Sequence, residues 1–403
     1  MVCAKRVCLD GQSLVKILHV IPTLSPSSGG PPEALRHLSR AYGEVGVEAE
    51  IVCQDDPAAP YLGNFPIPVH AMGAQASTYG FSRELLLWLR QNVTRFDGVV
   101  INSIWTFPSL AAAIAARGRV PYVVFTHGML DPWFKRTYPL KHFKKCVYWP
   151  VQYWILRQAE TVMFTSTLER DLAPQSFWPN RWNSLVVPYG TGEPPAATPG
   201  QSEALYGKLP RLRSRRYLLF LSRIHEKKGC DLLVEAFARV APAHPDVDLV
   251  IAGPDQIGLQ AKLQLQAQNL AIADRVHWPG LMIGDPKWGA LRGCEAFILP
   301  SHQENFGVAV AEALACGRPV LISNQVNIWP EIEQEEVGLV APDTLAGTEE
   351  LLSRWLLLDE AGRNAMITRT TDVFRKRYSM HSGAVAIKEL FESFSRKKPS
   401  PRL

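Results

Sequence analysis

The segment 300–320 contains the side chains whose types and spacing are best suited to chemistry. Glu304 follows the apolar run that ends at Leu299, and Glu312 comes after it with seven residues between them. Gly307 is placed to open a helix containing Glu312, so the two carboxylates can face one ligand from a loop and from a helix. A helix start offers free N–H groups and a positive dipole end, which suit a phosphate or sugar hydroxyls. Carboxylates accept hydrogen bonds from hydroxyls well, so a sugar and a ribose are suitable ligands.

The alternative interpretation of this segment is structural. An acidic residue near a helix start is favoured by the helix dipole without any ligand, and the second glutamate could be there by chance. Spacing alone leaves both interpretations open.

Two cations follow another apolar run, Tyr217–Leu221. Arg223 comes just past this expected strand, and Lys228 precedes Gly229, which is placed to open a helix. Two positive side chains at the carboxyl end of a strand suit a pyrophosphate. The alternative is a basic surface loop.

The first half of the chain has two weaker signals. Gly29 and Gly30 lie between the first expected strand and helix, where glycine allows a backbone to approach a ligand closely. His127 follows the buried run Tyr122–Phe125, at the end of a strand where a ligand could bind. An ordinary turn and a structural histidine are the alternatives.

The elements that position these residues alternate between strand and helix. Short apolar runs alternate with helical periods in both halves of the chain, which predicts α/β architecture with two doubly wound parallel sheets. The alternation breaks over residues 189–216, which are rich in proline and which we expect to be a connection with an ornamented loop. We therefore predict an N-terminal domain over 1–190 and a second domain over 191–375. Residues 376–403 are expected to form a helix that packs back on the first domain, followed by a basic tail. Ligands bind at the carboxyl ends of such strands, so the cleft between the domains is the expected site.

Composition argues against a disordered, a membrane-spanning or a disulfide-rich protein. The chain has 403 residues, 47% of them apolar and 20% charged, which suits a folded protein of two domains. No apolar run is long enough to span a bilayer, and Asp10, Gly11 and Gln12 interrupt the region where a secretory signal would be apolar. Seven scattered cysteines without a C-x-x-C pair suit reduced thiols in a cytosol. The net charge of +5 identifies no anionic partner, and we expect no nucleic acid.

These patterns together resemble glycosyltransferase family 4. The spacing of Glu304 and Glu312, followed by Gly317–Val320, is similar to the E-x7-E signature of that family and the G-x-P-V strand after it. The segment Arg223–Gly229 is similar to its R-x4-K-G element. The resemblance spans nearly the whole chain and is strongest from Tyr217 to Val340. It implies the GT-B fold, in which two Rossmann-like doubly wound domains face a central cleft. The resemblance also implies that the domain over 1–190 is the acceptor side and that the domain over 191–375 binds the nucleotide sugar.

The resemblance also implies a role for each candidate side chain. Glu304 would contact the donor sugar, and Glu312 would bind the ribose of the nucleotide. Arg223 and Lys228 would neutralise the leaving nucleotide diphosphate. Gly29 and Gly30 match a glycine-rich loop that faces the donor phosphates. His127 matches a histidine near the reacting centre. The backbone of Asn305, Phe306 and Gly307, beside the first glutamate, would also lie against the donor.

The chain departs from the family pattern after the G-x-P-V strand. Residues 324–331 lack the glycine-rich turn that often precedes Pro-Glu there, so we assign no donor contact to this loop. Asp246 and Asp248 form a D-x-D pattern, but they precede an apolar run, at the wrong end of a strand for a cleft ligand. We interpret them as part of a solvated loop and predict no metal ion and no cofactor besides the nucleotide sugar substrate.

The implied activity is retaining, metal-independent transfer of a hexose from a nucleotide diphosphate sugar. The acceptor would be a hydroxyl of a lipid-linked or growing surface polysaccharide, with the enzyme in the cytoplasm or on the inner face of the plasma membrane. Two other classes stay open: a nucleotide-sugar epimerase of the same fold and a non-catalytic GT-B scaffold.

Residues 134–157 mix cations with aromatic side chains. This combination suits an anionic membrane surface or a lipid pyrophosphate acceptor. The alternative is a domain helix with a solvated basic face and a buried aromatic face. The residues concerned, with the neighbouring Trp133, are Lys135, Arg136, Lys141, Lys144, Lys145, Tyr148, Trp149, Tyr153 and Trp154.

Overall fold

The structure, a computed structural model, describes residues 14–28, 30–63, 65–75, 77 and 79–397. The predictions made for the first 13 residues, for Gly29 and for the end of the basic tail lie outside these residues. Clustering of contacts divides the chain into two compact units. Unit 1 comprises the residues up to Gly192 together with those from Ser379 onward, and unit 2 comprises Glu193–Tyr378.

Unit 1 is built on a seven-stranded sheet in the order β3-β2-β1-β4-β5-β6-β7, and its described strands pair in parallel. Its strands are β1 Val15–Val20, β2 Val47–Cys53, β3 Val69–Ala71, β4 Gly98–Ile101, β5 Tyr122–Phe125, β6 Thr161–Phe164 and β7 Ser184–Val186. Its helices are α1 Gly30–Val45, α2 Arg83–Asn92, α3 Phe107–Ala116, α4 Trp133–Thr137, α5 Pro139–Gln158, α6 Thr167–Leu172 and α15 Met380–Lys397, with short turns η1 Pro26–Ser28, η2 Val93–Arg95 and η3 Ala173–Gln175. The strand order reverses between β1 and β4, which makes the carboxyl ends of these strands a switch point suited to ligands.

Unit 2 repeats the architecture with a six-stranded parallel sheet in the order β10-β9-β8-β11-β12-β13. Its strands are β8 Arg216–Leu221, β9 Val247–Ala252, β10 Val276–Gly280, β11 Ala296–Leu299, β12 Val320–Ser323 and β13 Gly338–Ala341. Its helices are α7 Pro199–Lys208, α8 Cys230–Val240, α9 Leu259–Asn269, α10 Asp285–Gly293, α11 Val308–Ala315, α12 Trp329–Gln334, α13 Leu345–Leu357 and α14 Glu360–Val373. The shorter helical turns are η4 Pro210–Ser214, η5 Glu226–Lys228, η6 Ala241–Ala243, η7 Ala273–Arg275 and the π-turn η8 Phe374–Tyr378.

The central strands of both sheets are buried along their whole length. All four residues of β4 and all four of β11 are buried, because helices cover both faces of a parallel sheet. This explains why these strands read as continuous apolar runs rather than as alternating ones. The two predicted doubly wound α/β halves are therefore confirmed as two parallel sheets.

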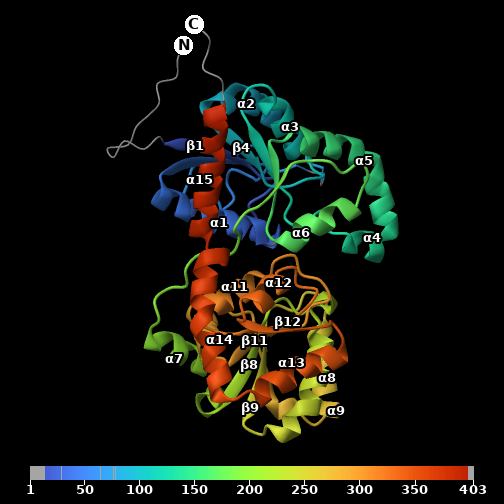
Figure 1. Ribbon diagram of the computed structural model, residues 1–403, viewed down its shortest axis with the longest axis vertical. Coiled ribbons are helices and arrows are strands. Elements are labelled where there is room, and N and C mark those ends of the chain that lie inside the picture. Colours follow the sequence, from blue (N-terminus) through green and yellow to red (C-terminus); the bar gives the residue numbers. More distant parts are fainter. Residues whose placement is uncertain (1–13, 29, 64, 76, 78, 398–403) are drawn as a thin grey trace. The chain divides into compact units, whose positions relative to one another are not determined.

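The C-terminal helix α15 belongs to unit 1. Its Ile387 and Phe391 are buried, and Lys388 Nζ donates a hydrogen bond to the carbonyl of Val45 at 2.8 Å, at the end of α1. A Cβ at Gly98 would lie 2.1 Å from Cε1 of Phe391, so the ring of Phe391 occupies the space that a larger residue would need. The helix lies along α1 (Figure 1).

The segment 189–216 is more ordered than predicted. Residues Pro199–Lys208 form α7, which packs on α10 so closely that a Cβ at Gly289 would lie 2.1 Å from the carbonyl of Gln201. Pro199 marks the first turn of this helix, where its missing N–H costs nothing, and Thr198 and Gln201 form a capping box. The loop prediction was wrong here because proline was taken as a breaker rather than as a helix start.

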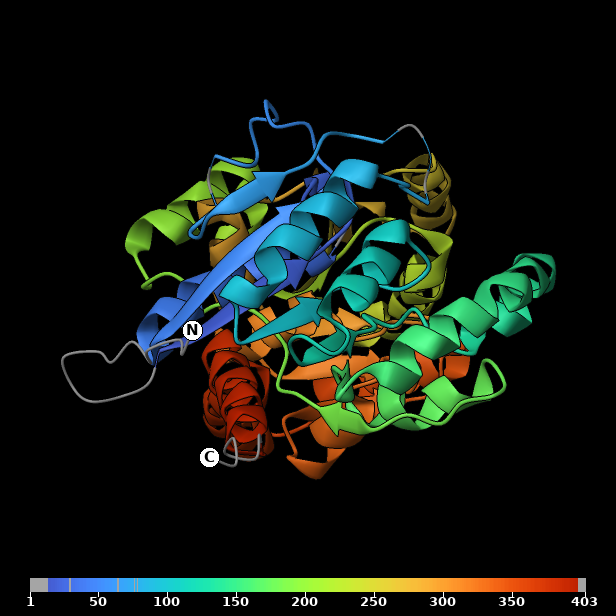
Figure 2. The ribbon, with the colours of Figure 1, turned by 90° about the horizontal axis from the view of Figure 1, so that it is seen from above.

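Helices α4 and α5 extend outward from the sheet of their unit (Figure 2). Among the described residues, none of the helices combines the length and the apolar character that crossing a bilayer requires.

Candidate functional site

In unit 2, the loops that follow the neighbouring strands β8 and β11 touch. Gly229 has φ +67°, and a Cβ there would lie 2.1 Å from the carbonyl oxygen of Pro300. The backbone N–H of His302 also donates to the carbonyl of Lys227 at 2.9 Å. Only glycine fits both the left-handed backbone and the close approach at residue 229, so this residue lets the two predicted motifs meet.

Lys228 and Glu304 form an ion pair at this contact. Lys228 is buried, with 6% of its surface exposed, whereas the Glu304 side chain is 21% exposed. The backbone of Glu304 is held on its other side, because its N–H donates to Gln325 at 2.9 Å and its carbonyl accepts from Asn327 at 3.0 Å. The structure therefore brings together two candidate residues that lie 76 positions apart in the chain.

Glu312 lies in α11 and is also buried. Its Oε1 is 2.7 Å from Nζ of Lys287, which comes from α10. Lys287 is a residue that sequence reasoning missed. No motif contains it, and the only local signal is that Asp285 and Pro286 just before it mark a helix start.

The residues between the two glutamates are placed by backbone geometry. Gly307 has φ +79° and caps the start of α11. Phe306 is buried, and its ring packs edge-on against Tyr378 at 5.7 Å between centroids. Asn305 Oδ1 accepts a long hydrogen bond of 3.5 Å from Asn327. Since the Phe306 ring belongs to the core, its backbone is the part left for a ligand.

Arg223 lies apart from the Lys228–Glu304 pair. Its side chain is exposed, and its Nη1 donates to Oε1 of Gln256 at 3.1 Å, in the loop after β9. The two predicted cations thus differ in setting, since one is buried and paired and the other is exposed to solvent.

In unit 1, His127 is partly buried in a strained turn after β5. It is a non-glycine residue with φ +48°, and its ring stacks on Phe125 at 4.5 Å with an interplanar angle of 6°. Burial lowers the pKa of His127 to about 3, so the imidazole is neutral near pH 7. Within the described part of the chain its Nε2 has no hydrogen-bond partner. A neutral, unpartnered ring nitrogen in a left-handed turn is an arrangement that functional sites often contain.

Glu169 holds the turn that contains His127. Its Oε1 accepts hydrogen bonds from Thr126 Oγ1 at 2.9 Å and from the Gly128 N–H at 2.7 Å, on either side of His127. Its Oε2 accepts from the N–H and the hydroxyl of Thr165 at 2.8 and 2.6 Å. Sequence reasoning missed this residue. Ser166-x-x-Glu169 has the form of a capping box, which would direct the carboxylate to its own helix rather than to the His127 turn.

The glycine-rich loop prediction needs correction. Gly30 is the first residue of α1 rather than part of a loop, and a Cβ at this position would meet no atom within 4 Å. The free N–H groups of the first helical turn are the part of this segment that suits a ligand.

Comparison with known proteins supports one family. Residues 203–373 match the family model of glycosyl transferases group 1, and residues 29–190 match that of the glycosyl transferase 4-like domain. The chain belongs to the family 4 type of glycosyltransferases. The predicted resemblance is thereby confirmed.

Relatives of this glycosyltransferase include two bacterial mannosyltransferases. The lipopolysaccharide core biosynthesis mannosyltransferase LpsB of Rhizobium meliloti is 26% identical over 194 residues, which are 45% of this chain and 53% of that relative. The match therefore spans about half the length of LpsB. The GDP-mannose:cellobiosyl-diphosphopolyprenol alpha-mannosyltransferase of Komagataeibacter xylinus is 24% identical over 397 residues, covering 95% of this chain and 94% of that one.

Solved structures show the same fold. Anabaena Alr3699/HepE in complex with UDP superposes with a TM-score of 0.76 at 20% sequence identity, covering 94% of this chain and all of that one. WaaG, a glycosyltransferase involved in lipopolysaccharide biosynthesis, has a TM-score of 0.62. The predicted GT-B fold is confirmed.

Of the D-x-D pattern of this glycosyltransferase, Asp246 lies in an exposed turn, as predicted, whereas Asp248 does not. Asp248 is fully buried within β9, where it pairs with Arg215 at 2.6 Å and with Nε2 of His277 at 2.8 Å. Asp246 pairs with Arg216 at 2.7 Å. The prediction of solvation was wrong for Asp248 because β9 begins two residues earlier than the apolar run suggests.

Changing Glu169 to Gln should destabilise unit 1, because an amide NH2 would replace one acceptor oxygen that faces two donors. We expect the free energy of unfolding to fall by about 1–3 kcal/mol, measured by urea unfolding followed by far-UV circular dichroism. Glu160→Gln, at an exposed position before β6, is the matched control. Equal midpoints for the two variants would contradict the role given to Glu169.

Proposed function

We propose that this chain transfers a hexose from a nucleotide diphosphate sugar to a hydroxyl acceptor. The observation that carries the proposal is the buried Lys228 paired with Glu304 where the β8 and β11 loops meet. A buried cation beside a sugar-binding carboxylate suits a group that leaves as a diphosphate while its sugar is held. HepE, which shares the fold, binds UDP, and LpsB is a mannosyltransferase, which supports this choice of donor.

Unit 2 binds the donor in this proposal. Glu312 accepts hydrogen bonds from the ribose hydroxyls, and the free N–H groups at the start of α11 contact the diphosphate. Lys228 and Arg223 stabilise the negative charge that develops on the diphosphate as the C1–O bond breaks. These two cations supply the charge that a metal ion supplies in other transferases, so we propose that added divalent metal is not required.

The anomeric configuration is retained by attack on the face from which the diphosphate leaves. The acceptor oxygen bonds to C1, the C1–O electron pair goes to the diphosphate, and a phosphate oxygen takes the acceptor proton. No enzymatic nucleophile takes part. His127 and Glu304 hold the sugar through hydrogen bonds. Since His127 is neutral, its Nε2 can accept or donate one such bond without carrying charge.

The acceptor in this proposal is a lipid-linked or growing surface polysaccharide. The acceptor named for the Komagataeibacter relative is a diphosphopolyprenol-linked sugar, and LpsB acts in lipopolysaccharide core biosynthesis. Such an acceptor would place the enzyme at the cytoplasmic face of a membrane.

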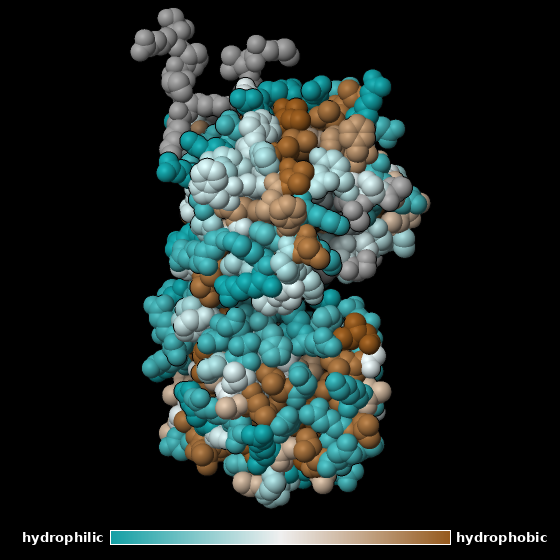
Figure 3. Space-filling view, turned by 90° about the vertical axis from the view of Figure 1, so that its right-hand side faces the viewer, coloured by the Kyte–Doolittle hydropathy of each residue, from teal (hydrophilic) through white to brown (hydrophobic). Residues whose placement is uncertain are grey.

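The outer face of α5 supports contact with an anionic membrane. Residues 133–159 contain six Lys and Arg residues and no Asp or Glu. One face of α5 exposes an apolar ridge at helical spacing, formed by Leu140 (82% exposed), Phe143 (73%), Val147 (74%) and Val151 (41%). Figure 3 shows hydrophobic side chains among hydrophilic ones on this side of unit 1. An exposed apolar ridge on a basic helix is typical of a segment that lies in a membrane interface.

Liposome flotation tests this surface. Changing Leu140 and Val147 to Ser should lower the partition onto vesicles containing anionic lipid by about tenfold or more, because these side chains would no longer enter the bilayer. Changing Lys141 and Lys144 to Glu should lower the partition onto anionic vesicles more than the partition onto neutral vesicles. Leu357→Ser, at a 77% exposed leucine of unit 2, is the control. Binding that does not depend on lipid, or that none of these changes lowers, would remove the membrane from the proposal.

A nucleotide panel tests the transferase itself. Thermal-shift binding to UDP, GDP and ADP identifies the base, and the matched donor sugars are then assayed with and without EDTA. Transfer to an acceptor with retention of configuration supports the proposal. Isomerisation of the sugar without acceptor would identify an epimerase, and failure to bind any nucleotide diphosphate would identify a scaffold.

A further inference from the structure

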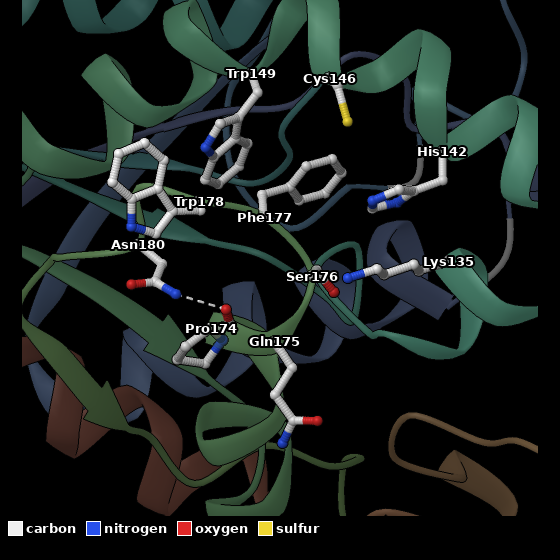
Figure 4. Close-up of a pocket in the computed structure, with 10 residues that line it drawn as sticks. All are labelled: Lys135, His142, Cys146, Trp149, Pro174, Gln175, Ser176, Phe177, Trp178 and Asn180. Carbon is white, nitrogen blue, oxygen red and sulfur yellow. Dashed lines mark hydrogen bonds between the residues drawn. The ribbon is translucent and has the colours of Figure 1, made fainter.

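Unit 1 contains a cavity of about 430 Å³ between α5 and the segment that follows η3. Its wall on the α5 side is formed by His142, Cys146 and Trp149, and the facing wall by residues 174–178 and Asn180. Lys135 of α4 closes one side (Figure 4). A volume of this size is typical of a small-molecule site.

The wall of this cavity is aromatic. The ring of Phe177 stacks between Trp149, at 4.5 Å, and His142, at 4.3 Å. Trp178 lies beside them and is 85% exposed, although tryptophan is among the largest apolar side chains. Since both faces of the Phe177 ring are covered, the aromatic surface left open to an aliphatic chain is that of Trp178.

The charge at the cavity is positive. None of the residues that line it is Asp or Glu, and among the described residues no carboxylate forms an ion pair with Lys135. The Lys135 ammonium points toward Ser176 (Figure 4). Burial, followed by the charges of Lys135 and Lys145, holds the pKa of His142 below its usual range, as expected where cations are not balanced. An unpaired ammonium beside an apolar wall suits a ligand with a phosphate at one end and a hydrocarbon at the other.

The cavity adjoins the His127 turn. Ser176 Oγ donates a hydrogen bond to the carbonyl of Leu130 at 2.6 Å. Leu130 is three residues from His127, so their Cα atoms lie at most roughly 11 Å apart. A ligand in the cavity is therefore within a short glycan's reach of the residue proposed to face the donor sugar.

We propose that this cavity binds the isoprenyl phosphate end of the lipid-linked acceptor, with Lys135 pairing the phosphate and Trp178 contacting the first carbons of the chain. This inference rests on the proposed transferase function. It assigns to unit 1 the part of acceptor recognition that does not depend on which sugars the acceptor carries.

Isothermal titration with farnesyl diphosphate, on the full chain and without donor, tests the inference. We expect stoichiometric binding that Lys135→Gln and Trp178→Ala each weaken about tenfold or more, since each change removes one half of the contact. Lys262→Gln, at an exposed lysine of α9 in unit 2, should leave binding within about twofold. Both test positions are exposed, and circular dichroism of each variant verifies the fold.

Two further ligands distinguish the sources of the phosphate. Pyrophosphate alone and dioctanoyl phosphatidylglycerol should both bind at least about tenfold more weakly than farnesyl diphosphate. Equal binding of pyrophosphate would overturn the inference in favour of a plain anion site, and equal binding of the phospholipid in favour of bulk membrane lipid. Unchanged affinity in both Lys135→Gln and Trp178→Ala would also overturn it. Nucleotide binding measured on the same samples tests the proposed transferase function separately. If the protein binds nucleotide but not farnesyl diphosphate, only the inference about the cavity is refuted.

Discussion

Replacing Lys228 by Met is expected to lower kcat by about 10²–10³-fold, the usual cost of removing one group that stabilises charge in a transition state. The affinity for the free nucleotide diphosphate should change much less, because in the proposed site Arg223 and the start of α11 would still contact it. The ratio of the two effects is informative, since a group that acts mainly on the leaving charge changes turnover more than ground-state binding. Steady-state kinetics and calorimetric nucleotide binding on the same preparation measure both.

The Lys228 variant leaves the partly buried Glu304 without its cation, which can destabilise the fold. The double variant Lys228→Met with Glu304→Gln removes the unpaired charge, so its stability should recover. Because Glu304 is itself assigned to the sugar, the effect of Lys228 on kcat is measured in the single variant. Lys262→Met, at an exposed lysine of α9, is the control for loss of a positive charge. A Lys228 variant with wild-type kcat would refute the leaving-group role.

Replacing Glu312 by Ala should weaken nucleotide binding by about 10- to 100-fold, since hydrogen bonds to a charged group contribute about 1.5–3 kcal/mol. The carboxylate would otherwise accept both ribose hydroxyls, and kcat at saturating donor should fall less than the affinity. Isothermal titration with the preferred nucleotide diphosphate and with its 2′-deoxy analogue measures the effect. The variant should bind the two ligands with similar affinity, because it lacks the acceptor that distinguishes them.

Lys287 provides the matched comparison for Glu312. Lys287→Met keeps the carboxylate but removes the cation 2.7 Å from it, so it should cost less affinity than Glu312→Ala and should retain the preference for ribose over 2′-deoxyribose. If Glu312→Ala binds as tightly as wild type, the ribose contact lies elsewhere.

Much of the secondary structure could be predicted because it depends on local patterns. The bounds of α5, α8 and α9 agree with the helical periods of the sequence, and strands β5 and β11 agree with its apolar runs. Two predictions were wrong for equally local reasons. Segment 189–216 was predicted as a loop because its prolines were taken as breakers, although proline also occurs at the start of a helix. The start of β9 was missed because a buried charged residue lies inside this strand.

The sequence by itself determined the family and the two carboxylates, because E-x7-E joins a loop to the helix directly after it and needs no distant partner. Only the tertiary structure decided which cation meets which carboxylate. Lys228 reaches Glu304 because β8 and β11 are neighbours in the sheet, and Lys287 reaches Glu312 because α10 lies near α11. The hydrogen bonds from the His127 turn to Glu169 likewise join segments that are far apart in the chain. The same is true of the residues that line the cavity beside α5. Such contacts depend on strand order and helix packing, and the spacing of residues along one sequence does not encode either of these directly.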